Sequence, residues 1–284
     1  MASVAGLTSE RAAGNCDGLI PCPVTPTAHP RSQELRASEA DRHTDQMHRR
    51  LEVCCFAVAD ARVAIANRAD RIELCAGRPE GGTTPSAGML HHARAVLSAP
   101  VFVMIRPRGG DFVYGPDEQA AMRIDAELVA RLGFPGIVIG ALTPARLIDI
   151  DCCAELIEIA KAAVPGISIT FHRAFDAAAD PISAYEVLRG LGVDRILTSG
   201  QRSDAVAGSV LLRELIAMSG QGFGPAILPG GGVRPTNAQT LLDLGATELH
   251  SSATARSNGA MDPQLVAQLA AIVHSGLPSV PADG

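Results

Sequence analysis

LEVCC at residues 51–55, RIELC at residues 71–75 and VFVMIR at residues 101–106 begin a series of eight short strand-like runs. The other five are GIVIG from Gly136, ISITFH from Ile167, DRILTS from Asp194, PAILPG from Pro225 and TELHSS from Thr247. Consecutive runs start 20 to 35 residues apart, so each gap has room for a helix. Because a parallel crossover needs about a dozen residues or more, this spacing predicts an α/β fold, a (β/α)8 barrel of the TIM type. A doubly wound open sheet is the competing arrangement.

Prolines mark where several of the intervening helices are predicted to begin. Pro116 opens a stretch whose apolar residues recur at helical spacing. Three further sites place an N-capping side chain before a proline at the first helical position, namely Thr143-Pro144, Asp180-Pro181 and Asp262-Pro263. These starts favour helices in the gaps between the strands.

The two ends of the chain differ from this regular part. Residues 1–50 contain several prolines and then a mixed-charge stretch with few apolar residues. Such a segment cannot bury enough surface to offset the entropy lost when it is ordered. We therefore predict a disordered extension over residues 1–50, with some helix near residues 38–48. A single barrel domain over residues 51–275 and a flexible tail over residues 276–284 complete the chain.

The composition limits the classes of partner. The 284 residues include 24 Lys and Arg against 30 Asp and Glu, and aromatic residues make up 3% with no Trp. A nucleic-acid-binding protein needs a cationic, base-stacking surface, which this balance does not supply. No apolar run is long enough to cross a membrane, and the N-terminus lacks the pattern of a secretory signal. The sequence therefore predicts no nucleic-acid partner, no membrane, and no nucleotide or flavin cofactor.

Cysteine usage indicates a reducing compartment. The chain has seven cysteines, an odd number, and two adjacent pairs, Cys54-Cys55 and Cys152-Cys153. Neither feature suits the spaced disulfide framework of an extracellular protein. We expect reduced thiols in the cytoplasm.

Strand alternation assigns each run one face toward the helices and one toward the barrel interior. The helix-facing set is apolar: Leu51, Val53, Ile72, Leu74, Val103, Ile105, Ile167, Ile169 and Phe171. The interior set contains Glu52, Cys54, Glu73, Cys75, Met104, Arg106, Ser168, Thr170, His172, Glu248 and His250. Burying an unpaired charge is costly, so we interpret this interior as a functional site. A structural ion-pair network without a ligand is the alternative.

Barrel enzymes place their chemistry at the carboxyl ends of the strands. The candidate catalytic residues are Glu52, Glu73, Arg106, Arg108, His172, Glu248 and His250. In an enzyme, Glu73 or His172 would act as general acid or base. Arg106 and Arg108 would stabilise developing negative charge.

A glycine loop after the seventh run is a candidate phosphate site. Three consecutive glycines leave backbone N–H groups uncovered near a predicted helix start. The loops after strands seven and eight are also where such barrels often hold phosphate. The predicted phosphate-binding residues are Gly230, Gly231, Gly232, Arg234, Ser251 and Ser252. A tight turn that needs glycine for its backbone angles is the alternative.

Cys54 and Cys75 end the first two runs on the same predicted face. Adjacent strands lie about 4.8 Å apart, so the two sulfurs could bridge one soft ion. Thiolates select Cu(I) or zinc over hard cations, and two ligands suit low-coordinate Cu(I) better than tetrahedral zinc. Buried cysteines that serve only as small apolar residues are the alternative.

Seven motifs lie within residues 51–256, namely LEVC at 51–54, RIELC at 71–75, MIRPRGGDFVY at 104–114, TFHRAFD at 170–176, RILTSGQ at 195–201, PGGGVR at 229–234 and ELHSSA at 248–253. Together they resemble the CutC family, and the resemblance implies a cytoplasmic role in copper homeostasis on a (β/α)8 barrel. It also implies that Cys54 and Cys75 are Cu(I) ligands. Departures are the N-terminal extension, the second cysteine at Cys55, and Thr83 where an aliphatic residue is more usual.

Two functional hypotheses remain, and the sequence leaves open whether the protein is an enzyme. The first is a Cu(I)-binding homeostasis protein. The second is a lyase or isomerase acting on a small phosphorylated substrate, since copper binding explains neither the glycine loop nor the arginines. A purely structural role is disfavoured because a scaffold needs no ionisable groups in its interior. Assembly into a homo-oligomer is left open.

Overall fold

The computed structural model describes residues 49–220, 224–255 and 260–275. The predicted extension lies outside these residues except for Arg49 and Arg50, and Arg50 already belongs to the first strand. The helix predicted near residues 38–48 and the tail from residue 276 also lie outside them. The part that is described holds every candidate site residue.

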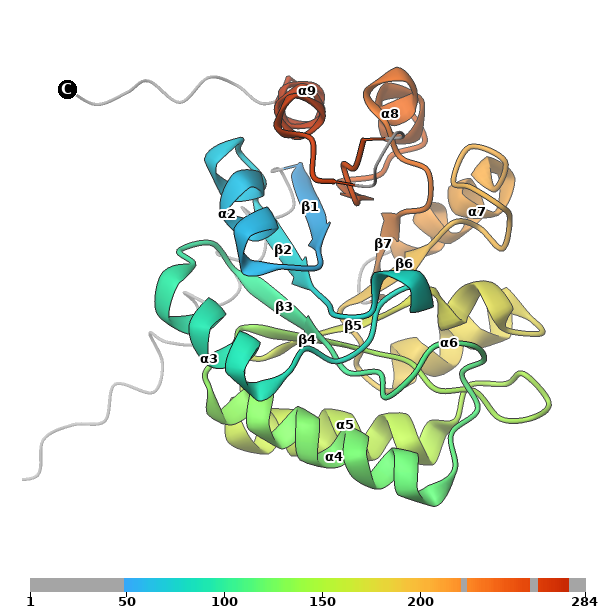
Figure 1. Ribbon diagram of the computed structural model, residues 1–284. Coiled ribbons are helices and arrows are strands. Elements are labelled where there is room, and N and C mark those ends of the chain that lie inside the picture. The colour runs from blue at the N-terminus through green and yellow to red at the C-terminus, as the bar shows by residue number, and fades with distance from the viewer. Residues whose placement is uncertain (1–48, 221–223, 256–259, 276–284) are drawn as a thin grey trace, which may run out of the picture. The chain divides into compact units, whose positions relative to one another are not determined.

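All eight predicted runs form strands, and the strands pair in parallel in the order β7-β6-β5-β4-β3-β2-β1-β8 (Figure 1). The two end strands approach each other, because a Cβ atom built at Gly230 would lie 3.3 Å from the Cβ atom of His250. The result is a nearly closed barrel. The strands are β1 (Arg50–Cys55), β2 (Arg71–Leu74), β3 (Val101–Met104), β4 (Gly136–Ile139), β5 (Ser168–Phe171), β6 (Arg195–Thr198), β7 (Ala226–Pro229) and β8 (Glu248–Ser251).

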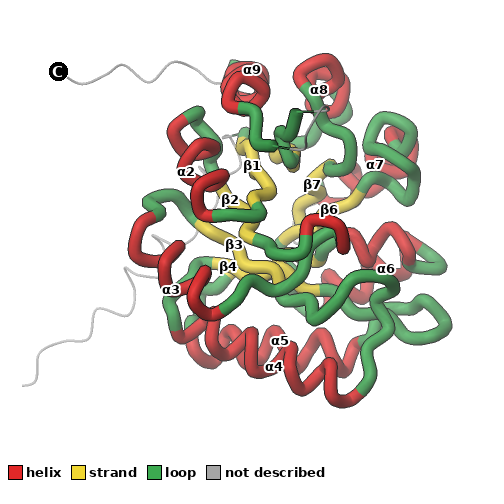
Figure 2. Tube along the Cα trace, viewed as in Figure 1, coloured by secondary structure: helices red, strands yellow, loops and turns green. Residues whose placement is uncertain are grey.

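A helix follows each strand in the described residues, and Figure 2 shows the helices around the outside of the strands. None of these helices combines the length and the apolar character needed to cross a membrane. Short 3-10 helices, η1 (Arg78–Glu80) and η2 (Arg173–Ala177), lie in the loops after β2 and β5. The α-helices are α2 (Val58–Ala66), α3 (Ala87–Val96), α4 (Pro116–Arg131), α5 (Ile150–Ala163), α6 (Pro181–Gly190), α7 (Ser209–Ser219), α8 (Pro235–Leu242) and α9 (Pro263–His274).

Three of the four predicted helix starts are confirmed. Helix α4 begins at Pro116, and α6 and α9 begin at the prolines that follow their capping residues Asp180 and Asp262. The start at Thr143-Pro144 is wrong, because Thr143 closes a turn by accepting a hydrogen bond from the Leu147 amide at 3.2 Å. Helix α5 begins only at Ile150, where the Asp149 side chain caps the Cys152 amide.

We expect Asp180→Ala and Asp262→Ala each to lower the free energy of unfolding by about 1 kcal/mol, the usual contribution of an N-cap. Each carboxylate accepts from two backbone amides of the first helical turn. Urea denaturation would measure the loss. Asp180→Asn is the matched control, since it keeps an acceptor and should cost only a fraction of this. An equal cost for the Ala and Asn variants would contradict the capping role.

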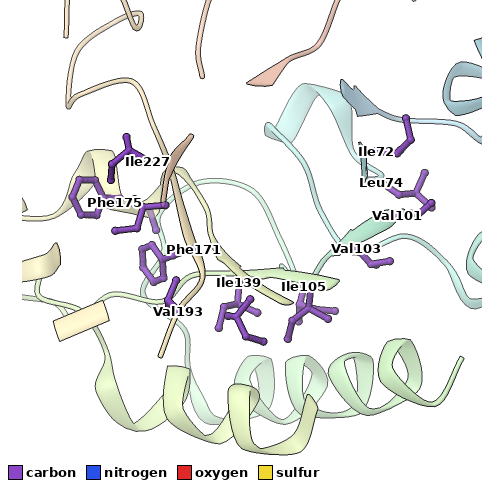
Figure 3. Packing of buried hydrophobic residues seen from close by; sticks show 14 of the residues in the cluster. Ile72, Leu74, Val101, Val103, Ile105, Ile139, Phe171, Phe175, Val193 and Ile227 are labelled. Carbon is purple, nitrogen blue, oxygen red and sulfur yellow. The ribbon is translucent and has the colours of Figure 1, made fainter. Parts of the chain in front are cut away.

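The apolar core has two layers. The larger lies between the strands and the helices and contains the whole predicted helix-facing set; Figure 3 shows part of it, including Ile72, Val103 and Phe171. The smaller lies inside the barrel and consists of Cys54, Cys75, Phe102, Met104 and Val138, with Phe56 packed against it. The predicted alternation of the apolar residues and of Cys54 and Cys75 is thereby confirmed.

Candidate functional site

The barrel interior begins with a layer of paired charges at the amino ends of the strands. Arg71 donates to Glu52 at 2.5 Å and also to Glu248. Arg195 donates to the same Glu248 oxygen at 3.1 Å and to the Ser168 hydroxyl at 2.8 Å. Burial opposes ionisation of Glu52 and Glu248, but the arginine charges hold the pKa of both carboxyls below the usual value. This layer neutralises two of the predicted catalytic carboxylates.

Arg71 and Arg195 are site residues that the sequence analysis missed. Both guanidinium groups lie over the Phe102 ring inside the barrel, at 4.8 and 5.3 Å from its centroid. Alternation could have found Arg71, because it lies two residues before Glu73 on the same face of β2. Each arginine is the first residue of its strand. The sequence analysis did not assign this position to the barrel interior.

Above this layer, the structure brings together Cys54, Cys75, Glu73 and His250. The sulfur atoms of Cys54 and Cys75 are 3.9 Å apart, and the Cys75 thiol is also 3.5 Å from a carboxyl oxygen of Glu73. One ligand atom from each of Cys54, Glu73 and His250 lies within 4.8 Å of the others. These four residues are all at least nine-tenths buried. They form what we call the thiol cluster.

Two features of the barrel orient His250 toward this cluster. Its Nδ1 atom lies 2.7 Å from Oε1 of Glu52, and its Nε2 atom faces Glu73 at 3.8 Å. Gly230 leaves space beside the ring, because a Cβ atom there would press against Cδ1 of Leu197 and lie 3.3 Å from Cδ2 of His250. A histidine held through one ring nitrogen by a carboxylate, with the other nitrogen free for a ligand, is typical of metal sites.

The electrostatics of the thiol cluster favour separated charges. The hydrogen bond between the two sulfur atoms lowers the pKa of Cys54 to about 5, although burial opposes this shift. Burial opposes the charged imidazole, but the acidic groups of Glu73, Cys54 and Glu52 raise the pKa of His250. Burial, together with the Cys54 sulfur, raises the pKa of Glu73. These shifts favour a thiolate at Cys54 and a positive charge on His250.

The remaining cysteines that the structure describes lie outside this cluster. Cys55 points into the layer between strands and helices, where burial and the Cys54 charge raise its thiol pKa. Cys152 and Cys153 are buried on α5. All five described cysteines are free.

Arg106 and Arg108 are not part of the thiol cluster. The Arg106 guanidinium donates to the carbonyls of Glu80, Gly82 and Gly110 at 2.8 to 3.0 Å, so it fastens the loops after β2 and β3. Arg108 pairs with Glu118 at 2.5 Å and with Asp111 at 2.9 Å, and its side chain is partly exposed. No hydrogen bond or ion pair among the described residues joins either arginine to the cluster.

His172 is buried between aromatic rings at the carboxyl end of β5. Its ring centroid is 5.2 Å from that of Phe112 and 5.9 Å from that of Phe171. Nδ1 accepts from the Ala174 amide at 3.1 Å, while Nε2 has no partner among the described residues. Burial, together with the Arg106 charge, lowers the pKa of His172 to about 3. The imidazole is therefore neutral near pH 7.

A pocket of about 280 Å³ connects the thiol cluster with the predicted phosphate loop. Cys54 and His250 line it from within, and Gly231, Gly232, Arg234, Ser251 and Ser252 line it from the loops after β7 and β8. The Gly230 amide donates to the Thr198 carbonyl at 2.9 Å, so that residue contributes space rather than a free donor. Five of the six predicted phosphate residues thus surround one pocket.

Arg173 also lines this pocket and was not singled out from the sequence. Its Nε atom is 2.7 Å from Asp176, and Nη2 donates to the Ser199 hydroxyl at 2.9 Å. Asp176 in turn accepts from Thr198, Ser199 and Gln201, which fixes the loop after β6. The sequence signal that could have identified Arg173 is the charged HRAFD stretch, which begins at the last residue of the fifth run.

Comparison with known proteins agrees with this fold. The model of the CutC family matches residues 49–255. The family protein CutC of Salmonella typhimurium (strain LT2) is 49% identical over 203 residues, covering 72% of this chain and 79% of the relative. That of Pectobacterium atrosepticum is 49% identical over 204 residues, covering 72% and 78%. The crystal structure of the copper homeostasis protein CutC from Streptococcus agalactiae superposes with a TM-score of 0.65 at 31% identity, covering 72% of this chain and 98% of that protein.

Proposed function

The chain belongs to the CutC family, and on this premise we propose that it serves copper homeostasis by binding Cu(I) through Cys54 and Cys75. The observation that carries the proposal is the 3.9 Å distance between these two buried sulfur atoms on adjacent strands. A metal–thiolate bond is about 2.3 Å long, so one ion can join both sulfurs at a bent angle.

His250 completes the proposed site as a third ligand. Its ring approaches Cys54 and Glu73 closely enough for one ion to touch all three side chains. Thiolates are soft ligands and imidazole is intermediate, whereas a carboxylate is hard. We therefore assign Cys54, Cys75 and His250 to the ion. Both the Cys75 thiol and the imidazole must be deprotonated to bind the ion. Glu73, which lies 3.5 Å from the Cys75 sulfur, would accept one proton, and the other would pass to solvent through the pocket that His250 lines.

The same chemistry supports a cytoplasmic location. Cu(I) and a pair of reduced thiols persist together only in a reducing compartment. The five described cysteines are free, and the two sulfurs of the proposed site are not joined in a disulfide.

Anaerobic titration of the purified protein against a chromophoric Cu(I) chelator tests the proposal. We expect the unmodified chain to take up about one Cu(I) and the Cys54→Ser/Cys75→Ser variant to take up none at the same chelator concentration. Cys152→Ser is the matched control, because Cys152 is equally buried but lies on α5. A parallel titration with Zn(II) tests metal selectivity.

Two results would overturn the copper assignment. One is equal Cu(I) binding by the double variant and the unmodified chain. The other is tighter binding of Zn(II) than of Cu(I), which would assign the cluster to zinc. Circular dichroism of each variant shows that a loss of binding does not come from unfolding.

A further inference from the structure

The pocket of about 280 Å³ beside the thiol cluster has a cationic wall that copper binding does not explain. Arg173 and Arg234 both line this pocket, together with Gly231 and Gly232. Positive side chains next to a cation site repel its ion. The two arginines therefore need another explanation, and an anion bound in the pocket would supply it.

The glycine loop lines the pocket, and its backbone amides are available as donors. The carbonyl groups of Gly231, Gly232 and Val233 are all occupied, by the Ala205 amide, the Asn237 side chain and the Ser251 hydroxyl at 2.9 to 3.0 Å. In contrast, the amides of these three residues donate to no group in the described part of the chain. Backbone donors in proteins usually have a partner. Because Gly231 is half-buried and Gly232 is exposed, these free amides are accessible to a bound acceptor.

Glycine is needed at these positions for the loop to form. Gly231 and Gly232 have φ values of 93° and 72°, a region that disfavours other residues. A Cβ atom at Gly231 would also lie 3.5 Å from the Arg173 guanidinium. The backbone therefore passes directly beside that charge. Helix α8 begins immediately after the loop, and its positive end adds to the field.

Both arginines are held in position by the protein. Arg173 is fastened by Asp176 and Ser199, as described above. Arg234 donates one N–H to the Thr254 carbonyl at 2.6 Å, and its own amide donates to Asn237 at 2.8 Å. A guanidinium fixed in this way loses little entropy on binding, and its planar donors match the oxygens of a phosphate.

We propose that this pocket binds a small phosphate monoester, with the phosphate between the glycine loop, Arg173 and Arg234 and the carbon part directed toward Cys54 and His250. The volume lies near the lower limit for ligand pockets, which suits a molecule of a few carbon atoms. This is the ligand class that the enzyme hypothesis requires. The proposal does not depend on copper, so either assignment can fail without the other.

Isothermal titration calorimetry, with thermal shift as a screen, tests the proposal on the full chain at constant ionic strength. The probes are glycerol 3-phosphate, erythrose 4-phosphate and ribose 5-phosphate, compared with inorganic phosphate, sulfate and glycerol. We expect at least one monoester to bind more tightly than inorganic phosphate, and glycerol not to bind. Arg173→Gln and Arg234→Gln should each weaken that binding about tenfold or more, since each removes charged hydrogen bonds.

Matched variants separate binding from folding. Arg189→Gln is the control, because Arg189 is an exposed arginine on α6 that pairs with Glu186. If either pocket variant is unstable, Ser252→Asp introduces a repelling charge into the pocket wall, and Ser252→Ala serves as its partner. Absence of binding by all three monoesters, tighter binding of inorganic phosphate, or equal binding by Ser252→Asp and Ser252→Ala would overturn the proposal.

Discussion

Replacing Arg71 by methionine should lower the free energy of unfolding by about 3–5 kcal/mol, the cost of removing one partner from a buried ion pair. Arg71 is bonded to Glu52 and Glu248 at once, and all three side chains are buried. Without the guanidinium, Glu52 retains only His250 and Glu248 retains only Arg195 as charged partners among the described residues. Urea denaturation followed by circular dichroism would measure the loss.

A second substitution shows whether the loss of stability arises from the carboxylates that no longer have Arg71 as a partner. Glu248→Gln added to Arg71→Met removes one of the two unpaired charges, so the double variant should be more stable than the sum of the two single effects predicts. Arg131→Met is the control at an exposed pair with Glu127, where we expect a change within about 0.5 kcal/mol. A cost for Arg71→Met as small as that of the control would contradict the network.

Glu52→Gln should weaken Cu(I) binding about 10- to 100-fold, the usual effect of removing a group that orients a metal ligand. The Glu52 carboxylate lies 2.7 Å from Nδ1 of His250, and it directs Nε2 of that ring toward the thiol cluster. An amide at this position can still accept a hydrogen bond but no longer increases the basicity of the imidazole. Competition with a Cu(I) chelator measures the change.

Glu248→Gln is the matched control for this effect. It also removes a carboxylate partner of Arg71 and disturbs the same charge layer, but Glu248 has no hydrogen bond to His250 among the described residues. The Cu(I) affinity of this control should therefore stay within a few-fold of that of the unmodified chain. An equal loss in both variants would mean that the charge layer affects copper through stability, and His250 would no longer be assigned as a ligand.

The interior of the barrel thus separates two kinds of polar group. The lower layer consists of the ion-paired side chains of Glu52, Arg71, Glu248 and Arg195. The thiol cluster lies above it and borders the pocket whose outer wall carries Arg173 and Arg234. Glu52 of the lower layer orients His250, so the ion-pair network and the proposed copper site are in direct contact.

Local physical chemistry determined the main outlines of this protein from sequence. The spacing of eight apolar runs predicted the barrel, because a helix is the compact way to connect parallel strands. Alternation placed Glu52, Cys54, Glu73, Cys75 and His250 inside, because neighbouring side chains in a strand point to opposite faces. Both rules depend only on residues close together in the chain, and the family motifs added the identity of the relatives.

The tertiary structure alone decided which of these groups meet. Arg71 and Glu248 are 177 residues apart in sequence, and they pair only because β1 lies between β2 and β8 in the sheet. Arg106 was predicted to serve the site, but three loop carbonyls bind its guanidinium. Likewise, His250 joins Cys54 only through the register of β8 against β1. The pattern along a strand specifies which face of the sheet a side chain occupies. The partner of that side chain depends on strand order, register and the paths of the loops.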